Sequence, residues 1–222
     1  MPLRRFLWVL ALAVALAASL AGRTAAAGPA AHLVENFNAA FIAIVKADDR
    51  TVRPSRFQML NDRLIESFNL PVMMERATGP RWQTANEMER ALVVDAFVRM
   101  SIATYLSRFE NYSGEYFKTI DEERRADGVT LVTTRLVRPR RLDATVTYVT
   151  EKFDDDWRIV DVIIGDGISE LALRKSEFTH ALNRGGIPEL SARLDQQAVK
   201  ILAQLSAKAQ REVASQSLSA DN

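Results

Sequence analysis

Two histidines, one isolated aspartate and two acidic clusters are the side chains of this sequence best suited to chemistry. His32 and His180 are far apart, and neither has a second histidine or a cysteine at the spacing of a metal site. The acidic clusters 122–123 and 154–156 lack the distal glutamate of a calcium-binding loop. We therefore predict no metal site and no cofactor, and interpret both clusters as solvated turns.

Asp161 lies between Ile159 and Ile163 in an apolar segment, where a buried carboxylate with a raised pKa could act as a base. This would suit an isomerase or dehydratase with a cone-shaped α+β fold acting on an apolar substrate. The other interpretation is a structural hydrogen-bond acceptor. We favour it because no tyrosine or histidine can be placed beside Asp161, and no nucleophile elbow, phosphate loop or dinucleotide motif occurs. We predict that the protein is not an enzyme and that four residues are structural: Asp161, Gly165, Gly167 and Ser169.

The first residues have the layout of a secretory signal. Arg4 and Arg5 precede the apolar run 6–20, and small residues follow up to Ala27. The run is shorter than the roughly 20 residues that span a bilayer. The sequence therefore predicts a cleaved signal peptide at 1–27 and export to the periplasm, where a protein without cysteine depends on its core for stability.

The remaining chain is long enough for one domain, predicted at 28–205, followed by a polar, flexible tail at 206–222. Without the three arginines of the leader, 26 of the 29 basic residues remain against 28 acidic ones, a net charge of −2. The short basic turn at 138–141 is too small for a nucleic-acid surface. We therefore predict no nucleic-acid partner.

The periodicity of apolar residues predicts helices followed by strands. Helices are expected at 32–46, 55–68 and 85–110, with Ser55 and Thr84 as caps, and a short apolar segment at 72–74. Strands are expected at 116–125, 129–137, 143–153 and 157–164, with a hairpin at Asp127-Gly128. Two further helices follow, separated by Gly185-Gly186. This order predicts an α+β fold, with a curved four-stranded antiparallel sheet wrapped by helices into a cone.

Apolar, deformable side chains are plentiful on these elements. The adjacent Met73 and Met74 are suited to irregular apolar ligands, because thioether side chains adapt their shape. Periodicity does not separate a dry core from a cavity between sheet and helices. If there is a cavity, we predict that it takes an apolar ligand and is lined by Phe57, Leu60, Leu64, Phe68, Val72, Met73, Met74, Trp82, Phe97, Met100, Tyr105, Phe109, Tyr148, Trp157, Ile159 and Val162.

Two segments resemble the MlaC (toluene-tolerance auxiliary) family of periplasmic lipid-shuttle proteins. The segment 68–117 has the motif Gly79-x-x-Trp82 before a long predicted helix, and aromatic residues follow at the end of that helix. The segment 157–182 has the strand, turn and Ser169 of the C-terminal signature. Two features are most similar to the hopanoid-associated (HpnM) branch of this family. One is the run ISELALRKSEF, and the other is the turn at 165–168, which is one residue longer than the Glu-Gly connection usual in the phospholipid shuttles.

The resemblance implies an NTF2/cystatin-like cone with an apolar cavity between its layers. It implies a monomeric periplasmic carrier of phospholipid or hopanoid-type lipid, linked to an ABC transporter. The expected partners are an inner-membrane lipid transport complex and an outer-membrane lipoprotein/porin complex, with transient membrane contact. Two alternatives remain: an enzyme with Asp161 as base, and a scaffold that binds only membrane proteins.

Overall fold

The computed structural model describes residues 27–46, 54–165 and 167–220, and it confirms an α+β fold. The predicted signal peptide lies outside the described residues except for Ala27. Helices make up the first half of this part: α2 (Pro29–Lys46), α3 (Pro54–Ser67), α4 (Leu70–Thr78), α5 (Pro80–Thr84) and α6 (Glu87–Arg108). The strands and the last helix follow: β1 (Tyr116–Arg124), β2 (Thr130–Val137), β3 (Ala144–Phe153), β4 (Asp156–Ile164), β5 (Ile168–Ser169) and α7 (Glu170–Ala220).

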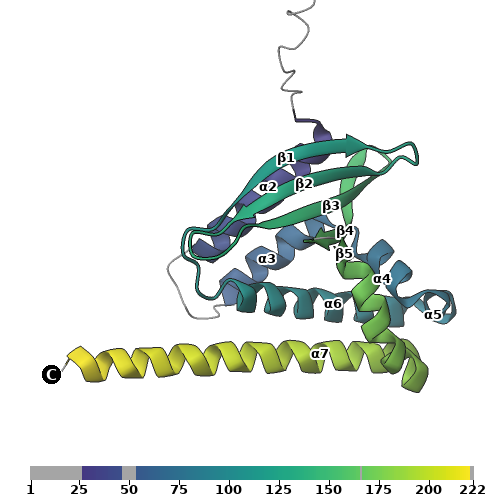
Figure 1. The fold of residues 1–222 in the computed structure, drawn as a ribbon. Helices are drawn as coiled ribbons and strands as arrows, with labels where there is room; N and C mark the ends of the chain where they lie inside the picture. The colour runs from purple at the N-terminus through teal and green to yellow at the C-terminus, as the bar shows by residue number, and fades with distance from the viewer. Residues whose placement is uncertain (1–26, 47–53, 166, 221–222) are drawn as a thin grey trace, which may run out of the picture.

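The strands form one open antiparallel sheet in the order β1-β2-β3-β4-β5. The predicted count of four strands is one too few, because Ser169 pairs with Ile163 and Ile168 with Ile164, which adds a short edge strand. The curved sheet lies over α2, α3 and α6 (Figure 1). The hairpin predicted at Asp127-Gly128 is confirmed, with Gly128 at a φ of 88°.

A β-bulge in β4 changes which residues share a face of the sheet. Tyr148 pairs with Val162 and Val149 with Asp161, but Thr150 pairs with Ile159, so Val160 is the extra residue. Ile159 and Val162 therefore lie on the same face although they are three positions apart. Simple alternation along the strand does not predict this arrangement.

Two helix starts differ from the sequence-based expectation. The helix predicted at 55–68 does end there, with α3 ending at Ser67, but Asn69-Leu70-Pro71 also begins the helix α4: the side chain of Asn69 accepts a hydrogen bond from the Val72 N–H at 3.2 Å, and proline is tolerated in the first turn. Helix α6 begins after Asn86, not at Thr84. Asn86 and Glu89 form a reciprocal capping box, in which each side chain accepts from the other residue's backbone N–H at 2.9 Å.

The last helix is bent where the sequence predicted a break. Gly185 and Gly186 have non-helical backbone angles, with Gly186 at a φ of 67°, and Pro188 follows. The second half of α7 runs back along α6 (Figure 1), where Arg99 of α6 and Asp195 form an ion pair at 2.8 Å. The segment predicted as a flexible tail is helical up to Ala220. Among the described residues, no helix is both long and apolar enough to span a membrane.

Candidate functional site

A cavity of about 740 Å³ lies between the sheet and the helices. Its volume falls within the range of about 300–1,000 Å³ that is usual for ligand pockets. Every helix except α5, and every strand except β5, contributes to its wall. The apolar part of the wall consists of Phe37, Phe41, Leu64, Phe68, Leu70, Met73, Phe97, Tyr105, Phe109, Phe117, Leu136, Ala144, Val146, Tyr148, Val162, Ile164 and Leu171.

Aromatic rings form much of the wall on the helical side. Phe37 packs edge-on against Phe68, with 5.0 Å between ring centroids, and Phe41 against Phe109 at 4.8 Å. The ring of Tyr105 is 5.8 Å from Phe41 and also packs edge-on. Edge-to-face contacts fix the rings relative to one another. The aromatic side of the cavity is therefore formed by side chains that hold one another in place.

The wall also has uncharged polar residues: Ser101, Thr104, Ser107, Asn111, Ser113 and the pair Asn38 and Tyr148. The Tyr148 hydroxyl donates a hydrogen bond to Oδ1 of Asn38 at 2.6 Å, and both side chains are buried. Burial raises the pKa of the Tyr148 phenol far above its ordinary value, more than the bond to Asn38 lowers it. Burial also raises the pKa of Tyr105, which borders the cavity rather than bulk water. Both phenols are therefore neutral at physiological pH and act as hydrogen-bonding groups, not as bases.

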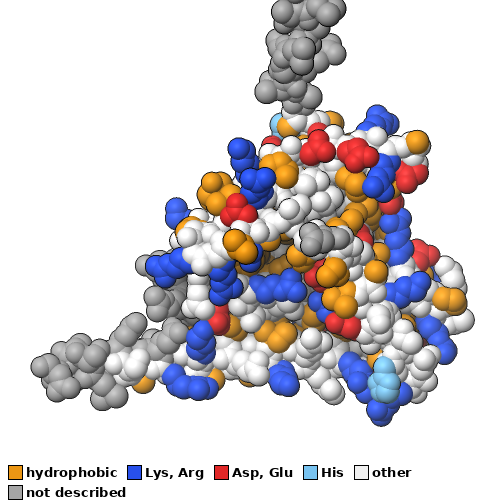
Figure 2. Space-filling view, in the orientation of Figure 1, with side chains coloured by type: hydrophobic (Ala, Val, Ile, Leu, Met, Phe, Trp, Pro, Cys, Tyr) orange, Lys and Arg blue, Asp and Glu red, His pale blue; other side chains and the backbone are white. Residues whose placement is uncertain are grey.

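Charged residues border the cavity where the wall reaches the molecular surface. Arg108 and Arg174 share the carboxylate of Glu170, at 3.7 and 3.6 Å. The other charged residues of the wall are Glu110, Glu115, Arg138, Arg140 and Arg141. Arg108 and Glu110 near the end of α6 are exposed, as are Arg140 and Arg141, so the cavity opens to solvent between the end of α6 and the turn between β2 and β3. Hydrophobic side chains are visible between the sheet and the helices below it (Figure 2).

The structure brings half of the predicted lipid-contacting residues together in this cavity. These are Leu64, Phe68, Met73, Phe97, Tyr105, Phe109, Tyr148 and Val162. They come from α3, α4, α6, β3 and β4 and the segments that follow α3 and α6. That they contact lipid remains a prediction.

The other predicted residues do not line the cavity. Leu60, Met74, Met100 and Ile159 are almost completely buried in the core. Trp82 is buried in α5, where the guanidinium of Arg90 lies 5.5 Å from its ring centroid and joins α5 to α6. Phe57, Val72 and Trp157 are half-buried away from the cavity.

Several wall residues were not among the predicted contacts. The sequence could have indicated Asn38. It lies on the apolar stripe of its helix, four residues after Val34 and three before Phe41, and a buried polar side chain in such a position needs a hydrogen-bond partner. Phe37 and Phe41 lie on the apolar face of the helix predicted at 32–46, and helical spacing does not distinguish a cavity wall from a core. The arginines of the 138–141 turn were noted only as a basic turn.

Asp161 connects β4 to the start of α7. Its Oδ1 accepts hydrogen bonds from the backbone N–H groups of Val162 at 2.7 Å and Leu171 at 3.0 Å, and its Oδ2 accepts one from the Ser169 hydroxyl at 2.6 Å. The Ser169 oxygen in turn accepts from the Ala172 N–H at 2.9 Å. Both carboxylate oxygens are therefore engaged, and Asp161 is not part of the cavity wall. The arrangement gives it no position from which to abstract a proton from a cavity-bound molecule.

The remaining predicted structural residues lie in the same turn. Gly165 and Gly167 both have positive φ, 61° and 110°, which other residues adopt only with strain. In the described ranges, no three histidine, cysteine or acidic side chains are placed to hold a metal ion.

Comparison with known proteins agrees with this architecture. A family model described as MlaC protein matches residues 35–196. No curated protein sequence matches the chain. Among solved structures, a phospholipid-binding protein from Ralstonia solanacearum, solved in complex with a phospholipid, is similar with a TM-score of 0.69 and 20% sequence identity. The match covers 78% of this chain and 99% of that one, and at this identity it shows a shared fold. Since the family model spans most of the chain, from α2 to the second half of α7, the protein belongs to the MlaC family.

Proposed function

We propose that this protein is a periplasmic lipid carrier that encloses the apolar part of one lipid in the cavity between sheet and helices. The observation that carries the proposal is the cavity itself, whose wall is mostly aromatic and aliphatic and which is bordered by exposed charged residues, among them Arg140 and Arg141. Membership of the MlaC family supports it, as does the similar fold of a protein solved with a phospholipid.

The physical task of such a carrier is desolvation. Each methylene group kept from water is worth about 0.8 kcal/mol, so a 16-carbon chain in transit represents more than about 10 kcal/mol. An apolar cavity lowers this cost without any chemical step. The Tyr148 hydroxyl and the Asn38 side-chain oxygen satisfy each other, so neither of these two groups opposes an apolar ligand as an unpaired atom.

The cargo is a phospholipid or a hopanoid-type lipid. The long turn at 165–168 and the run ISELALRKSEF at 168–178 favour the hopanoid-associated branch of the family. The carrier exchanges its lipid between the inner and outer membranes, with an ABC-transporter-linked complex on the inner side and a lipoprotein/porin complex on the outer side as partners. The predicted signal peptide at 1–27 directs it to the periplasm, where it acts as a monomer.

Two matched variants test the cavity as the lipid site. Val146 and Val149 lie on the same strand, β3, and their odd separation places them on opposite faces of the sheet. Val146 lines the cavity and Val149 does not. We expect Val146→Phe to lose most of the lipid that co-purifies with the wild-type protein, because the added ring fills the space, and Val149→Phe to retain it.

The measurement is native mass spectrometry of protein purified from the periplasmic fraction, followed by identification of the extracted lipid. Thermal melts of both variants show whether each is folded. A wild-type protein that is consistently free of lipid, or equal lipid content in both folded variants, would refute the carrier function.

A further inference from the structure

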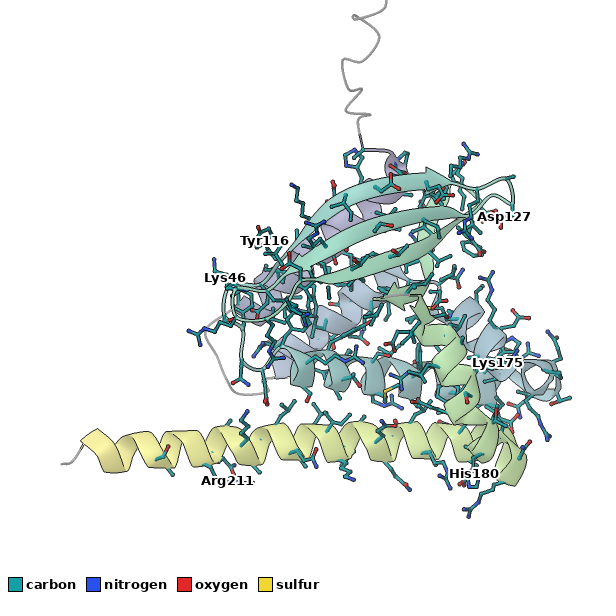
Figure 3. All side chains as sticks on the ribbon, in the orientation of Figure 1. Lys46, Tyr116, Asp127, Lys175, His180 and Arg211 are labelled. Carbon is teal, nitrogen blue, oxygen red and sulfur yellow. The ribbon has the colours of Figure 1, made fainter. Side chains whose placement is uncertain are left out.

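The turn between β2 and β3, residues 138–143, combines three arginines with an exposed leucine at the opening of the cavity. Arg138, Arg140 and Arg141 border the cavity, and Leu142 is 88% exposed. The turn lies at the same end of the sheet as Tyr116 and Lys46, opposite the hairpin that carries Asp127 (Figure 3). We call residues 138–143 the mouth turn.

The positive charge of the mouth turn is only partly offset by carboxylates, because its three arginines stand against the single acid Asp143 within the turn. In the part of the chain that the structure describes, none of the three arginines forms an ion pair, whereas Arg108 and Arg174 share Glu170. Glu115 interacts electrostatically with Arg141 without pairing with it: its carboxylate accepts from the backbone N–H of Ser113 at 2.6 Å and from the Ser113 hydroxyl at 3.0 Å. The mouth turn is therefore a local cationic surface on a chain that is nearly neutral after loss of its leader.

Arg138 fixes the shape of the turn and has bonding capacity left. Its Nη2 donates to the carbonyl of Leu142, and its backbone N–H donates to Oδ1 of Asp143 at 3.3 Å. Its Nε is buried and has no hydrogen-bond partner among the described residues.

The exposed side chain of Leu142 indicates which kind of anionic partner the mouth turn fits. A soluble anion would explain the arginines but gives no role to a leucine that is exposed to solvent beside them. At the surface of an anionic bilayer, guanidinium groups pair with lipid phosphates, and an apolar side chain enters the boundary between head groups and acyl chains. Both features of the mouth turn match this chemistry.

From this geometry we infer that the mouth turn docks the protein on anionic lipid bilayers, with Arg140 and Arg141 on lipid phosphates and Leu142 inserted between head groups. The inference rests on the proposed carrier function, because docking by this turn brings the opening of the cavity to the membrane from which a lipid is taken. The arginines supply attraction and orientation, and the leucine anchors the turn. Several Lys and Arg side chains stand at this end of the surface (Figure 2).

Vesicle co-sedimentation of the exported, mature protein tests the inference. We expect binding to vesicles of phosphatidylcholine with one third phosphatidylglycerol, weaker binding at high salt, and little binding to phosphatidylcholine alone. Arg140→Gln/Arg141→Gln should lower partitioning about 30-fold, because each basic residue near an anionic surface contributes about fivefold. Leu142→Ser should lower it about tenfold, since an apolar side chain no longer enters the bilayer.

The matched control is Arg81→Gln/Arg184→Gln, which removes the same charge from exposed positions outside the cavity wall. It should bind vesicles within about twofold of the wild type. Absence of wild-type binding, or equal losses in the mouth-turn and control pairs, would overturn the inference.

Lipid content, measured on the same samples by native mass spectrometry, separates docking from cargo binding. Leu142→Ser, which changes a residue of the mouth turn outside the cavity wall, should keep its bound lipid while losing vesicle binding. If Leu142→Ser loses its co-purified lipid instead, the turn serves cargo binding and the docking inference is wrong while the carrier function stands. A wild-type protein without lipid that still binds anionic vesicles would refute the carrier and leave the docking surface.

Discussion

The Tyr148 hydroxyl and the Asn38 side-chain oxygen lie 2.6 Å apart and join β3 to α2 across the cavity wall. Because both groups are buried, each depends on the other to satisfy its hydrogen-bonding capacity. The pair fixes the position of a helix that carries Phe37 and Phe41 against a strand that carries Val146. The shape of the cavity therefore depends on a polar contact as well as on packing.

Removing both partners should cost less stability than the sum of removing each one alone. Tyr148→Phe leaves the Asn38 oxygen buried without a donor, which should lower the free energy of unfolding by about 1–3 kcal/mol. The double variant Tyr148→Phe/Asn38→Leu should be less destabilised than the sum of the single variants, because no orphaned polar group remains. Urea unfolding of the four proteins gives the coupling energy. Additive losses would show that the two residues act independently.

Alkaline pH should destabilise the folded protein through its buried phenols. Burial raises the pKa of Tyr148 and of Tyr105 above the value of about 10 expected for tyrosine in an unfolded chain. The folded state thus holds these protons more tightly than the unfolded state does. This contribution to stability is fully present below pH of about 10 and is lost as pH rises toward the raised values.

The free energy of unfolding, measured between about pH 8 and 11.5, checks this expectation. Tyr148→Phe should show a shallower alkaline decline than the wild type, although it starts from a lower stability. Tyr116→Phe changes an exposed side chain at the start of β1 and should decline as the wild type does. Identical declines in the wild type and Tyr148→Phe would contradict the assignment.

Asp161→Asn should damage the junction between β4 and α7 but leave lipid binding intact. The amide retains one acceptor for the three donors that Asp161 satisfies, from Val162, Ser169 and Leu171, so we expect a loss of about 1–3 kcal/mol in stability. Asp155→Asn, at a fully exposed position, should change stability little. Thermal melts and native mass spectrometry give the two results. Undiminished stability combined with lost lipid would place Asp161 in the binding site.

The contact between Gly28 and Glu122 allows a test of where the predicted signal peptide is cleaved. The backbone nitrogen of Gly28 donates to Oε2 of Glu122 at 2.6 Å, and a side chain at position 28 would come within 2.5 Å of that carboxylate. If cleavage follows Ala27, this nitrogen is the terminal ammonium and pairs with Glu122. Glu122→Gln in the exported protein should then cost about 1–3 kcal/mol, more than Glu123→Gln at the neighbouring exposed position.

Intact mass of the exported protein identifies its first residue directly. A mature chain that begins elsewhere, or equal effects of the Glu122 and Glu123 variants, would refute the proposed ion pair.

The sequence predicted the elements with regular patterns and missed those that depend on contacts. The hairpin at Asp127-Gly128 and the break at Gly185-Gly186 follow from local backbone preferences, and both are present. Helix α4 was missed because Asn69 and Pro71 suit the first turn of a helix as well as the end of one. The two residues of β5 form a strand only because β4 lies beside them.

The sequence predicted the apolar character of the candidate site but not which residues line it. Leu64, Phe68 and Tyr105 line the cavity, whereas Leu60 and Met100, with the same apolar character, are buried in the core. The difference depends on how α3 and α6 are placed against the sheet, which helical periodicity does not specify. The bulge at Val160 had the same effect in β4, since it decides which residues face the cavity.

The bend at Gly185 and Gly186 decides how many parts of the molecule α7 can contact. A straight helix of the 51 residues assigned to α7 would be a rod of about 77 Å. Such a rod could border the cavity with Leu171 or brace α6 with Asp195, but it could not reach both places. A φ of 67° at position 186 would strain any residue other than glycine. Gly186 therefore allows the same stretch of chain to line the cavity and to support α6.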